Sequence, residues 1–377
     1  MLAPMRVVFL SNSPVPYQRE LLEAIEREGQ LEVHPFFLGS RDPGRAWPDP
    51  RAIPRTRILP ALAVPGAPPE LALHWSLPSE LRRIHADIAI VCGYSQAAFQ
   101  LGMATLVGSR CPFVLWSELP RIGVGAAPVR LVRRALIAPV EFSRGVLAIG
   151  QRAAEAWRQI LRPRIPVANF PYVCDVERYL ALPRRPRGAR PFTLLFVGQL
   201  IERKGVDLLL HAFIAACARR SDLQLRLAGE GPLRARLEAM VPPGLRTRIE
   251  FCGFVPWEAL PALYADADAL VLPSRHDGWG LVVNEALASG IPVIASEAVG
   301  AGLDLLRDGA AGLRVPVGDC AALAEALVRI PETAEQMGRA ARALAAKLSP
   351  ADAARRLFTL LSAARRGELR DALGAVW

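Results

Sequence analysis

Residues 196–213 read FVGQLIERKGVDLLLHAF and combine glycine, adjacent cations and a helical pattern in an order that suits an anionic ligand. An apolar run ends at Gly198, a short loop carries Arg203, Lys204 and Gly205, and periodic apolar residues follow. Glycine lets the backbone approach a ligand, and the start of a helix offers unpaired N–H groups to an anion. A lysine at that place is a point charge suited to phosphate. The segment therefore predicts a phosphate site.

Lysine is rare in this chain, which makes the position of Lys204 informative. Of 46 basic residues only Lys204 and Lys347 are lysines, and the rest are arginines. A solvated loop lysine is the simpler explanation for a random chain, but the scarcity of lysine here favours a phosphate role. Gln199, directly after the glycine, could donate an uncharged hydrogen bond to the same group.

Residues 273–296, PSRHDGWGLVVNEALASGIPVIAS, place two carboxylates beside a glycine-rich turn. Asp277 lies in the loop after an apolar run, and Glu285 lies about one turn into a predicted helix. Both could face one cleft, where carboxylates accept hydrogen bonds from the vicinal hydroxyls of a sugar or ribose. The N–H groups that follow Gly278 and Gly280 suit a phosphate or sugar oxygen. On spacing alone, a capping aspartate and a solvated glutamate are the simpler explanation.

Two other patterns resemble ligand motifs but favour turns. Asp266 and Asp268 form a D-x-D pattern between a predicted helix and a predicted strand, where aspartate favours turns and caps. Gly229–Gly231 begins like a dinucleotide fingerprint, but Arg234 occupies the position of its last glycine. The six cysteines and five histidines show no metal-ligand spacing, so we expect no bound metal and no disulfide framework.

Short apolar runs alternate with helical patterns along the whole chain, which predicts an α/β protein with parallel sheets. The expected strands are Arg6–Leu10, Leu31–Phe37, Ile88–Val91, Phe113–Trp116, Gly145–Ala148, Thr193–Val197, Leu223–Ala228, Ile249–Phe254, Ala269–Leu272 and Pro292–Ala295. The expected helices include Gln18–Glu28, Gln151–Leu161, Val206–Ala216 and Leu233–Met240. Ligands of such sheets bind at the carboxyl ends of the strands.

A proline- and arginine-rich segment divides the alternating pattern in two. Residues 183–190 read PRRPRGAR and cannot build a core. We therefore predict a first doubly wound domain over residues 1–183 and a linker over 184–190. A second such domain covers 191–350 and faces the first across a cleft, and a helical segment over 351–377 could pack back on the first domain.

The charge is distributed unevenly between the two halves. Residues 1–190 hold 25 arginines and 15 acids, whereas residues 191–377 hold 21 basic and 21 acidic residues. The whole excess of +10 therefore lies in the first half, which favours an anionic partner there. No binding motif accompanies the charge, so nucleic acid is disfavoured.

Residues 128–144 could form a basic amphipathic helix on an anionic membrane, because arginines 130, 133, 134 and 144 lie among apolar residues. An ordinary surface helix is the alternative. No stretch reaches the roughly 18 apolar residues of a membrane span, and the apolar run near the N-terminus is too short for a signal peptide. We expect a reduced, cytoplasmic protein, with peripheral contact on the inner face of the cell membrane as one option.

The second half resembles the donor-binding domain of retaining GT-B glycosyltransferases of the "group 1", family-4-like class. The resemblance covers about residues 192–330 in unbroken order. Its pieces are FVGQLIERKG, LAGEGPLRARL, IEFCGFV, LYADADALVLPS, HDGWGLVVNEALASGIPVIAS and GLDLLRDGAAGLRV. The first half resembles the family in layout, with SNSPVPYQRE and PYVCDVERY as further similar segments. The resemblance implies the GT-B fold, with two Rossmann-like domains, and a metal-independent hexosyltransferase-like enzyme without a cofactor.

The resemblance also implies roles for individual residues. Lys204 and the residue after Gly198 would bind the donor diphosphate. The family usually has arginine at that second position and this chain has Gln199, so either a charge is missing or Arg203 replaces it. The family's two acids, E-x7-E, are Asp277 and Glu285 here, and they would contact the transferred sugar and the ribose.

Further donor contacts are implied around these residues. Phe254 and Val255 would offer backbone to the base, and Gly280 and Leu281 would offer N–H groups to the phosphate or sugar. Trp279 is a further donor-binding candidate, and the selection of a sugar hydroxyl would depend on the side chains around Asp277 and Trp279.

The acceptor side is less clearly marked. Glu118 follows a predicted strand and is the best candidate for orienting an acceptor or the donor sugar, although a solvated loop carboxylate is the alternative. The implied reaction moves a sugar, with retained configuration and same-face attack, from a nucleotide sugar to a glycan or lipid-linked acceptor in polysaccharide or glycolipid synthesis. A nucleotide-sugar epimerase and a degenerate, non-catalytic nucleotide-sugar-binding protein are the alternatives.

Overall fold

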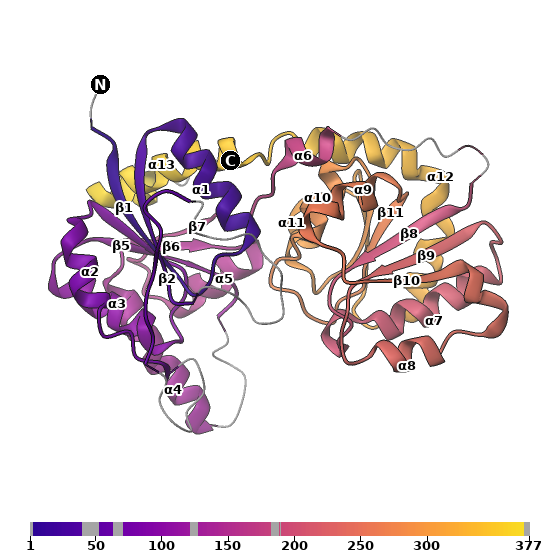
Figure 1. Cartoon of the computed structure of the whole chain (residues 1–377), viewed down its shortest axis with the longest axis horizontal. Helices are drawn as coiled ribbons and strands as arrows, with labels where there is room; N and C mark the ends of the chain where they lie inside the picture. The colour runs from indigo at the N-terminus through magenta and orange to yellow at the C-terminus, as the bar shows by residue number, and fades with distance from the viewer. Residues whose placement is uncertain are drawn as a thin grey trace. The chain divides into compact units, whose positions relative to one another are not determined.

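The computed structural model describes residues 3–39, 53–62, 71–120, 127–181, 188 and 190–372. The chain divides into two compact units. The first unit consists of Met1–Tyr172 together with Pro350–Trp377, and the second of Val173–Ser349 (Figure 1). The linker expected over residues 184–190 lies largely outside the described residues.

The first unit is a parallel sheet with helices on both faces (Figure 1). Its described strands follow the order β3-β2-β1-β4-β5-β6-β7. The inner strands are buried on both faces, which explains their continuous apolar runs. The strands are β1 Met5–Ser11, β2 Leu31–Phe37, β3 Arg57–Ile58, β4 Ile88–Val91, β5 Phe113–Ser117, β6 Gly145–Ala148 and β7 Val167–Asn169. The helices are α1 Pro16–Glu28, α2 Leu77–Ile84, α3 Ala97–Gly108, α4 Ala127–Ile137, α5 Gln151–Ile160, α13 Pro350–Arg366 and α14 Leu369–Ala372, with a 3₁₀ turn η3 at Ala138–Phe142.

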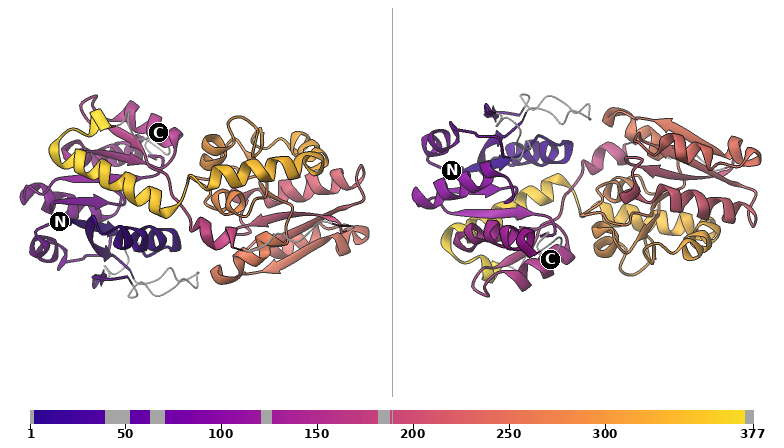
Figure 2. Two further views of the ribbon diagram at one scale, coloured as in Figure 1. Left: turned by 90° about the horizontal axis from the view of Figure 1, so that it is seen from above. Right: turned by 90° about the horizontal axis from the view of Figure 1, so that it is seen from below.

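Helix α13 belongs to the first unit although it comes last in sequence. Figure 2 shows α13 in yellow beside α1 in indigo, and the two helices pack against each other. Arg355 on α13 forms an ion pair of 2.8 Å with Glu28 at the end of α1. The chain therefore returns from the second unit to complete one face of the first sheet.

The second unit has the same architecture. Its described strands follow the order β10-β9-β8-β11-β12-β13, and every pair is parallel. The strands are β8 Phe192–Val197, β9 Leu223–Ala228, β10 Ile249–Gly253, β11 Ala269–Leu272, β12 Val293–Ser296 and β13 Gly312–Val315. The helices are α6 Val176–Leu180, α7 Val206–Cys217, α8 Arg234–Ala239, α9 Leu260–Ala265, α10 Val282–Ala288, α11 Gly300–Leu305 and α12 Cys320–Ala345, with 3₁₀ turns η4 Glu202–Lys204, η5 Pro243–Arg248 and η6 Trp257–Ala259.

Each sheet has one point where the strand order reverses direction. It lies between β1 and β4 in the first unit and between β8 and β11 in the second. Loops on either side of such a point diverge and leave room for a ligand at the carboxyl ends of the strands. The expected α/β class with two doubly wound, Rossmann-like domains is confirmed.

The boundary between the units lies earlier than the composition predicts. We expected the first domain to reach residue 183, whereas residues 173–181 belong to the second unit. Helix α6 explains the difference, because Val176 and Tyr179 are buried and the Tyr179 ring packs edge-on to Tyr264 of α9. The boundary between the units therefore precedes α6.

Candidate functional site

The loops that follow β8 and β11 meet at the reversal point of the second sheet and are joined by several hydrogen bonds. The backbone N–H of Arg275 donates to the carbonyl of Arg203 over 2.8 Å, and the Arg203 guanidinium donates to the carbonyl of His276 over 2.9 Å. Arg275 also donates to the carbonyl of Glu202 over 2.7 Å and forms a two-pronged ion pair with Asp207 at the start of α7. The Arg275 guanidinium lowers the pKa of Asp207. These contacts fix the 3₁₀ turn that carries Lys204.

Lys204 and Asp277 form the centre of this site. The Lys204 Nζ lies 2.5 Å from Asp277 Oδ2, and the Arg203 guanidinium lies 3.5 Å from Oδ1 of the same carboxylate. The side chains of Lys204 and Asp277 are 13% and 11% exposed, whereas Arg203 is 40% exposed. Two cations thus flank one carboxylate, and a diphosphate could take the place of the carboxylate between them.

Glycines set the close approach of these loops. Gly205 has φ +67°, and a Cβ there would lie 2.3 Å from the carbonyl oxygen of Pro273. Gly229 has φ +151°, and a Cβ there would lie 1.8 Å from the carbonyl oxygen of Gly198. Side chains at these positions would force the loops apart. Gly198 and Gly205 therefore lie where the sequence predicts, at the two ends of the cationic loop.

The turn after β11 is held against the neighbouring strand. The N–H of Asp277 donates to the carbonyl of Ala298 over 3.1 Å, and the N–H of Gly300 donates to the carbonyl of Asp277 over 3.2 Å. Gly280 has φ +88°, and a Cβ there would lie 2.8 Å from Val299. The backbone on both sides of the turn is therefore fixed, and the Asp277 carboxylate points at Lys204.

The first unit holds a cavity of about 550 Å³ at its own reversal point. It is lined by the loops after β1, β4 and β5 and by Tyr172. Glu118, directly after β5, lies in this lining, and the Tyr172 hydroxyl lies 3.3 Å from its Oε1. The backbone carbonyl of Glu118 accepts a hydrogen bond of 3.1 Å from the indole of buried Trp157, which anchors the loop.

A family model described as glycosyl transferases group 1 matches residues 191–332, which include both loops of the second unit. Residues 191–332, called the group 1 domain below, are thus similar to the group 1 glycosyltransferases. The two Rossmann-like units give the chain the GT-B fold, and the structure of Anabaena HepE in complex with UDP matches 95% of this chain and 100% of that chain, with a TM-score of 0.73 and 20% identity.

Curated relatives match part of the chain. The chain is 34% identical over 161 residues to the alpha-D-kanosaminyltransferase of Streptomyces kanamyceticus, which covers 41% of this chain and 42% of that protein. It is 32% identical over 245 residues to the GDP-mannose-dependent alpha-(1-6)-phosphatidylinositol monomannoside mannosyltransferase of Mycolicibacterium smegmatis, which covers 60% of this chain and 61% of that protein. The chain thus spans less than two thirds of the length of these relatives.

Trp279 of the group 1 domain is not available as a side chain to a ligand. It is 2% exposed, and its indole N–H donates to the side chain of Asn284 over 2.9 Å. This burial gives no support to a donor contact through the Trp279 side chain, and the place of Trp279 among the donor-binding residues stays a prediction. Its backbone carbonyl accepts a hydrogen bond of 2.7 Å from Ala301, which ties the glycine-rich turn to α11.

Glu285 faces the core of the domain and not the loop that carries Asp277. Helix α10 begins at Val282, so Glu285 lies one turn into it, as expected. However, Glu285 is 5% exposed, and the Tyr264 hydroxyl donates to its Oε2 over 2.7 Å. Burial raises the pKa of Glu285, although hydrogen bonds from Tyr264 and Tyr179 act in the opposite direction. Glu285 is thus held by Tyr264, and its place in one cleft with Asp277 stays a prediction.

Replacing Glu285 by glutamine should change stability in a pH-dependent way. Because the pKa of Glu285 is raised above its ordinary 4.5, ionisation destabilises the folded state once the pH rises above that value. The variant should melt close to wild type at pH 4 and at a relatively higher temperature at pH 8. Thermal melts at both pH values measure this difference, with a glutamine at Glu335, which is 90% exposed, as the control. An equal difference at both pH values would contradict the argument.

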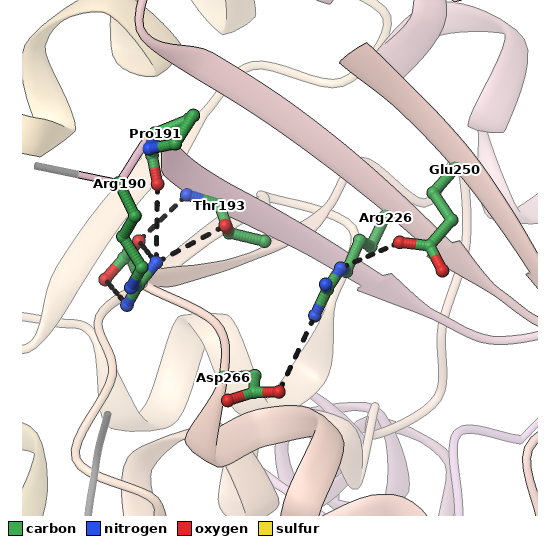
Figure 3. A network of polar contacts seen from close by, with 7 residues as sticks. Arg190, Pro191, Thr193, Arg226, Glu250 and Asp266 are labelled. Carbon is green, nitrogen blue, oxygen red and sulfur yellow. Dashed lines mark hydrogen bonds and ion pairs between the residues drawn. The ribbon is translucent and has the colours of Figure 1, made fainter. Parts of the chain in front are cut away.

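The two aspartates of the D-x-D pattern pair with arginines. Asp268 is 3% exposed and accepts two hydrogen bonds from Arg190, at 2.7 and 2.8 Å, and one from the N–H of Thr193 at 2.8 Å. Asp266 ends α9 and lies 4.0 Å from Arg226, which also pairs with Glu250 (Figure 3). These carboxylates fasten the strand ends of the sheet, which is a structural role.

The region expected to contact a base contains an arrangement that sequence reasoning missed. Phe254, directly after β10, is 52% exposed. Trp257 follows three residues later. The Arg178 guanidinium lies over its ring, 3.4 Å from the ring centroid, and also donates a hydrogen bond to the Trp257 carbonyl over 2.8 Å. Arg178 belongs to PYVCDVERY, one of the segments that resemble the family, so an arginine in that segment could have indicated this contact.

Within the described residues, no group of three or more His, Cys, Asp or Glu side chains could hold a metal ion.

Proposed function

We propose that the chain is a retaining glycosyltransferase that moves a sugar from a nucleoside-diphosphate sugar to a glycan or lipid-linked acceptor. The observation that carries the proposal is the Lys204–Asp277 pair, flanked by Arg203, at the reversal point of a group 1 domain. HepE, which has the same fold, is described in complex with UDP.

Lys204 and Arg203 are proposed to neutralise the departing diphosphate. Fixed charges aimed at the leaving group are usually the largest contribution to such catalysis. Helix α7 begins directly after Gly205 and adds the positive end of its dipole. The family's arginine is Gln199 here, and the position of Arg203 beside Asp277 supports the idea that Arg203 replaces that charge. We propose that these side chains supply the positive charge without a resident metal or other cofactor.

Asp277 is proposed to change partners when the donor binds. Once the diphosphate pairs with Lys204, the carboxylate is released to accept hydrogen bonds from the transferred sugar. In a same-face displacement the acceptor hydroxyl gives its proton towards the leaving phosphate, so no protein nucleophile is required. The burial of Glu285 against Tyr264 gives no support to a contact between Glu285 and the ribose. We assign to Glu285 the role of holding α9 against α10.

The acceptor is proposed to bind in the cavity of the first unit. Glu118 lines it at the carboxyl end of β5, where a carboxylate could orient an acceptor hydroxyl. Asn12 and Ser13, after β1, line the same cavity and offer further hydrogen-bonding groups.

Helix α4 is proposed to contact an anionic membrane. Val129, Leu131 and Val132 are 42%, 71% and 60% exposed, and the exposed Arg130 and Arg134 lie on the same helix. Apolar residues among arginines suit the surface of an anionic bilayer. The structure contains no helix, among the described residues, that is long and apolar enough to cross a membrane.

Replacing Arg130 and Arg134 by serine should weaken binding to vesicles that contain anionic lipid about tenfold or more, because each arginine near such a surface contributes to binding. Vesicle co-sedimentation at low salt measures this, with neutral vesicles as a second condition. The matched control replaces exposed Arg82 and Arg83 on α2 of the same unit. Equal retention of both double variants would count against α4 as the contact.

The proposed function as a whole is tested with a panel of nucleotide sugars. Thermal shift reports donor binding, and release of nucleoside diphosphate in the presence of glycan and lipid extracts reports transfer. Release that depends on the acceptor is expected for a transferase. An epimerase would convert its donor without an acceptor, and binding without release in every case would favour a non-catalytic protein.

A further inference from the structure

We propose that the cavity of the first unit holds a sugar ring of the acceptor against Tyr17 and Tyr172, so that the acceptor ends in a saccharide and not in a bare lipid phosphate. The inference deepens the proposed function. It rests on that function, because only a transferase uses the bound saccharide as an acceptor. The binding site itself can be tested without any donor.

Aromatic side chains form part of the cavity lining. The rings of Tyr17 and Tyr172 lie with centroids 4.2 Å apart and an angle of 38° between their planes. Trp116, at the end of β5, contacts the Tyr172 ring edge-on at 5.3 Å and donates its indole N–H to the carbonyl of Phe170 over 2.9 Å. Buried Trp116 thus holds Tyr172 in place, while Tyr17 and Tyr172 are only partly buried and line the cavity. Aromatic faces at the wall of a polar cavity suit the apolar C–H face of a pyranose ring.

The lining of the cavity also contains hydrogen-bonding groups. Asn12, Ser13, Ser95 and Ser117 line it, together with Glu118. Amides and hydroxyls both donate and accept hydrogen bonds, and the carboxylate accepts them, as the several hydroxyls of a sugar require. A volume of about 550 Å³ is ample for a saccharide end group.

The charge of the cavity argues against a phosphate monoester as the bound end group. The described lining residues include one arginine, Arg133, and one glutamate, Glu118. A phosphate monoester carries nearly two negative charges at neutral pH and would need more positive than negative charge around it. A neutral sugar ring imposes no such requirement.

Tyr172 has two separable roles in this arrangement. Its ring forms part of the stacking wall, and its hydroxyl donates to Glu118 over 3.3 Å. Burial and the nearby Glu118 raise the pKa of Tyr172, so the hydroxyl stays protonated and able to donate at neutral pH. Tyr172→Phe removes the hydroxyl alone, whereas Tyr172→Leu removes the ring as well.

The test measures binding of methyl α-D-glucopyranoside, methyl α-D-galactopyranoside, methyl α-D-mannopyranoside and decyl phosphate to the full chain by saturation-transfer NMR and calorimetry. At least one glycoside should bind wild type more tightly than decyl phosphate. Tyr172→Leu and Tyr17→Leu should weaken it about tenfold or more, and Tyr172→Phe should stay within about threefold. The control is Phe142→Leu, because Phe142 is 68% exposed and lies in the same unit.

Three results would overturn the inference: binding of no glycoside by wild type, tighter binding of decyl phosphate, or unchanged glycoside binding by both well-folded leucine variants. None of these measurements involves a nucleotide sugar. If glycosides bind as expected but no nucleoside diphosphate binds, the proposed transferase function fails while the saccharide site stands.

Discussion

Lys204→Ala should lower kcat about 10²- to 10³-fold, because it removes a fixed positive charge from the departing diphosphate. It should also weaken the binding of nucleoside diphosphate, since the 2.5 Å contact shows that this ammonium lies at the reversal point beside Asp277. Steady-state kinetics with the best donor of the panel and calorimetry with its nucleoside diphosphate measure the two effects. Arginine at this position should recover part of the activity, because the charge is kept while its shape changes.

The matched control is Lys347→Ala. Lys347 is the chain's other lysine, lies in the same unit and is exposed after the end of α12. Its loss should leave kcat and donor affinity unchanged. If Lys204→Ala bound and turned over the donor like wild type, the phosphate assignment would be wrong, whatever the family resemblance implies.

Gly229→Ala should destabilise the second unit by about 3 kcal/mol or more, which is the upper range for an overpacked and strained position. A Cβ at Gly229 would lie 1.8 Å from the carbonyl oxygen of Gly198, and φ is +151°. The backbone there is also tied down, because the N–H of Gly229 donates to the carbonyl of Gly253 over 2.8 Å. The loop that begins at Gly198 must shift, so donor binding should weaken as well.

Hydrogen exchange of peptides from β8 and β9 measures this loss locally, which avoids assuming that both units unfold together. Gly244→Ala is the control, because a Cβ there meets nothing within 4 Å. Faster exchange is expected for the Gly229 variant alone. Equal exchange in both variants would show that the β8 and β9 loops can separate at little cost.

The regular elements could be predicted because parallel strands are buried and flanked by turn residues. Ile88–Val91, Gly145–Ala148 and Ala269–Leu272 are found with the expected bounds. Three strands were missed, and two of them, Arg57–Ile58 and Val167–Asn169, have two and three residues, too few to show a pattern; the third is Gly312–Val315. Their pairing with longer neighbours decides their conformation.

The donor loops could be predicted because a strand order that reverses brings the loops after β8 and β11 together. The direction of individual side chains could not. Glu285 and Trp279 lie beside the site in sequence, but packing turns both inwards towards Tyr264 and Asn284. Tyr17 and Tyr172 are 155 positions apart in number, and only the folded sheet places their rings together.

The central claim is that a sugar leaves a nucleoside diphosphate at Lys204 and is joined to an acceptor. The most direct measurement incubates the full chain with a donor and a glycan or lipid-linked acceptor, then compares released nucleoside diphosphate with the mass of the acceptor. We predict one mole of nucleoside diphosphate for each mole of acceptor heavier by one sugar residue, with both lost in Lys204→Ala. Donor consumption without any change in acceptor mass would contradict the account.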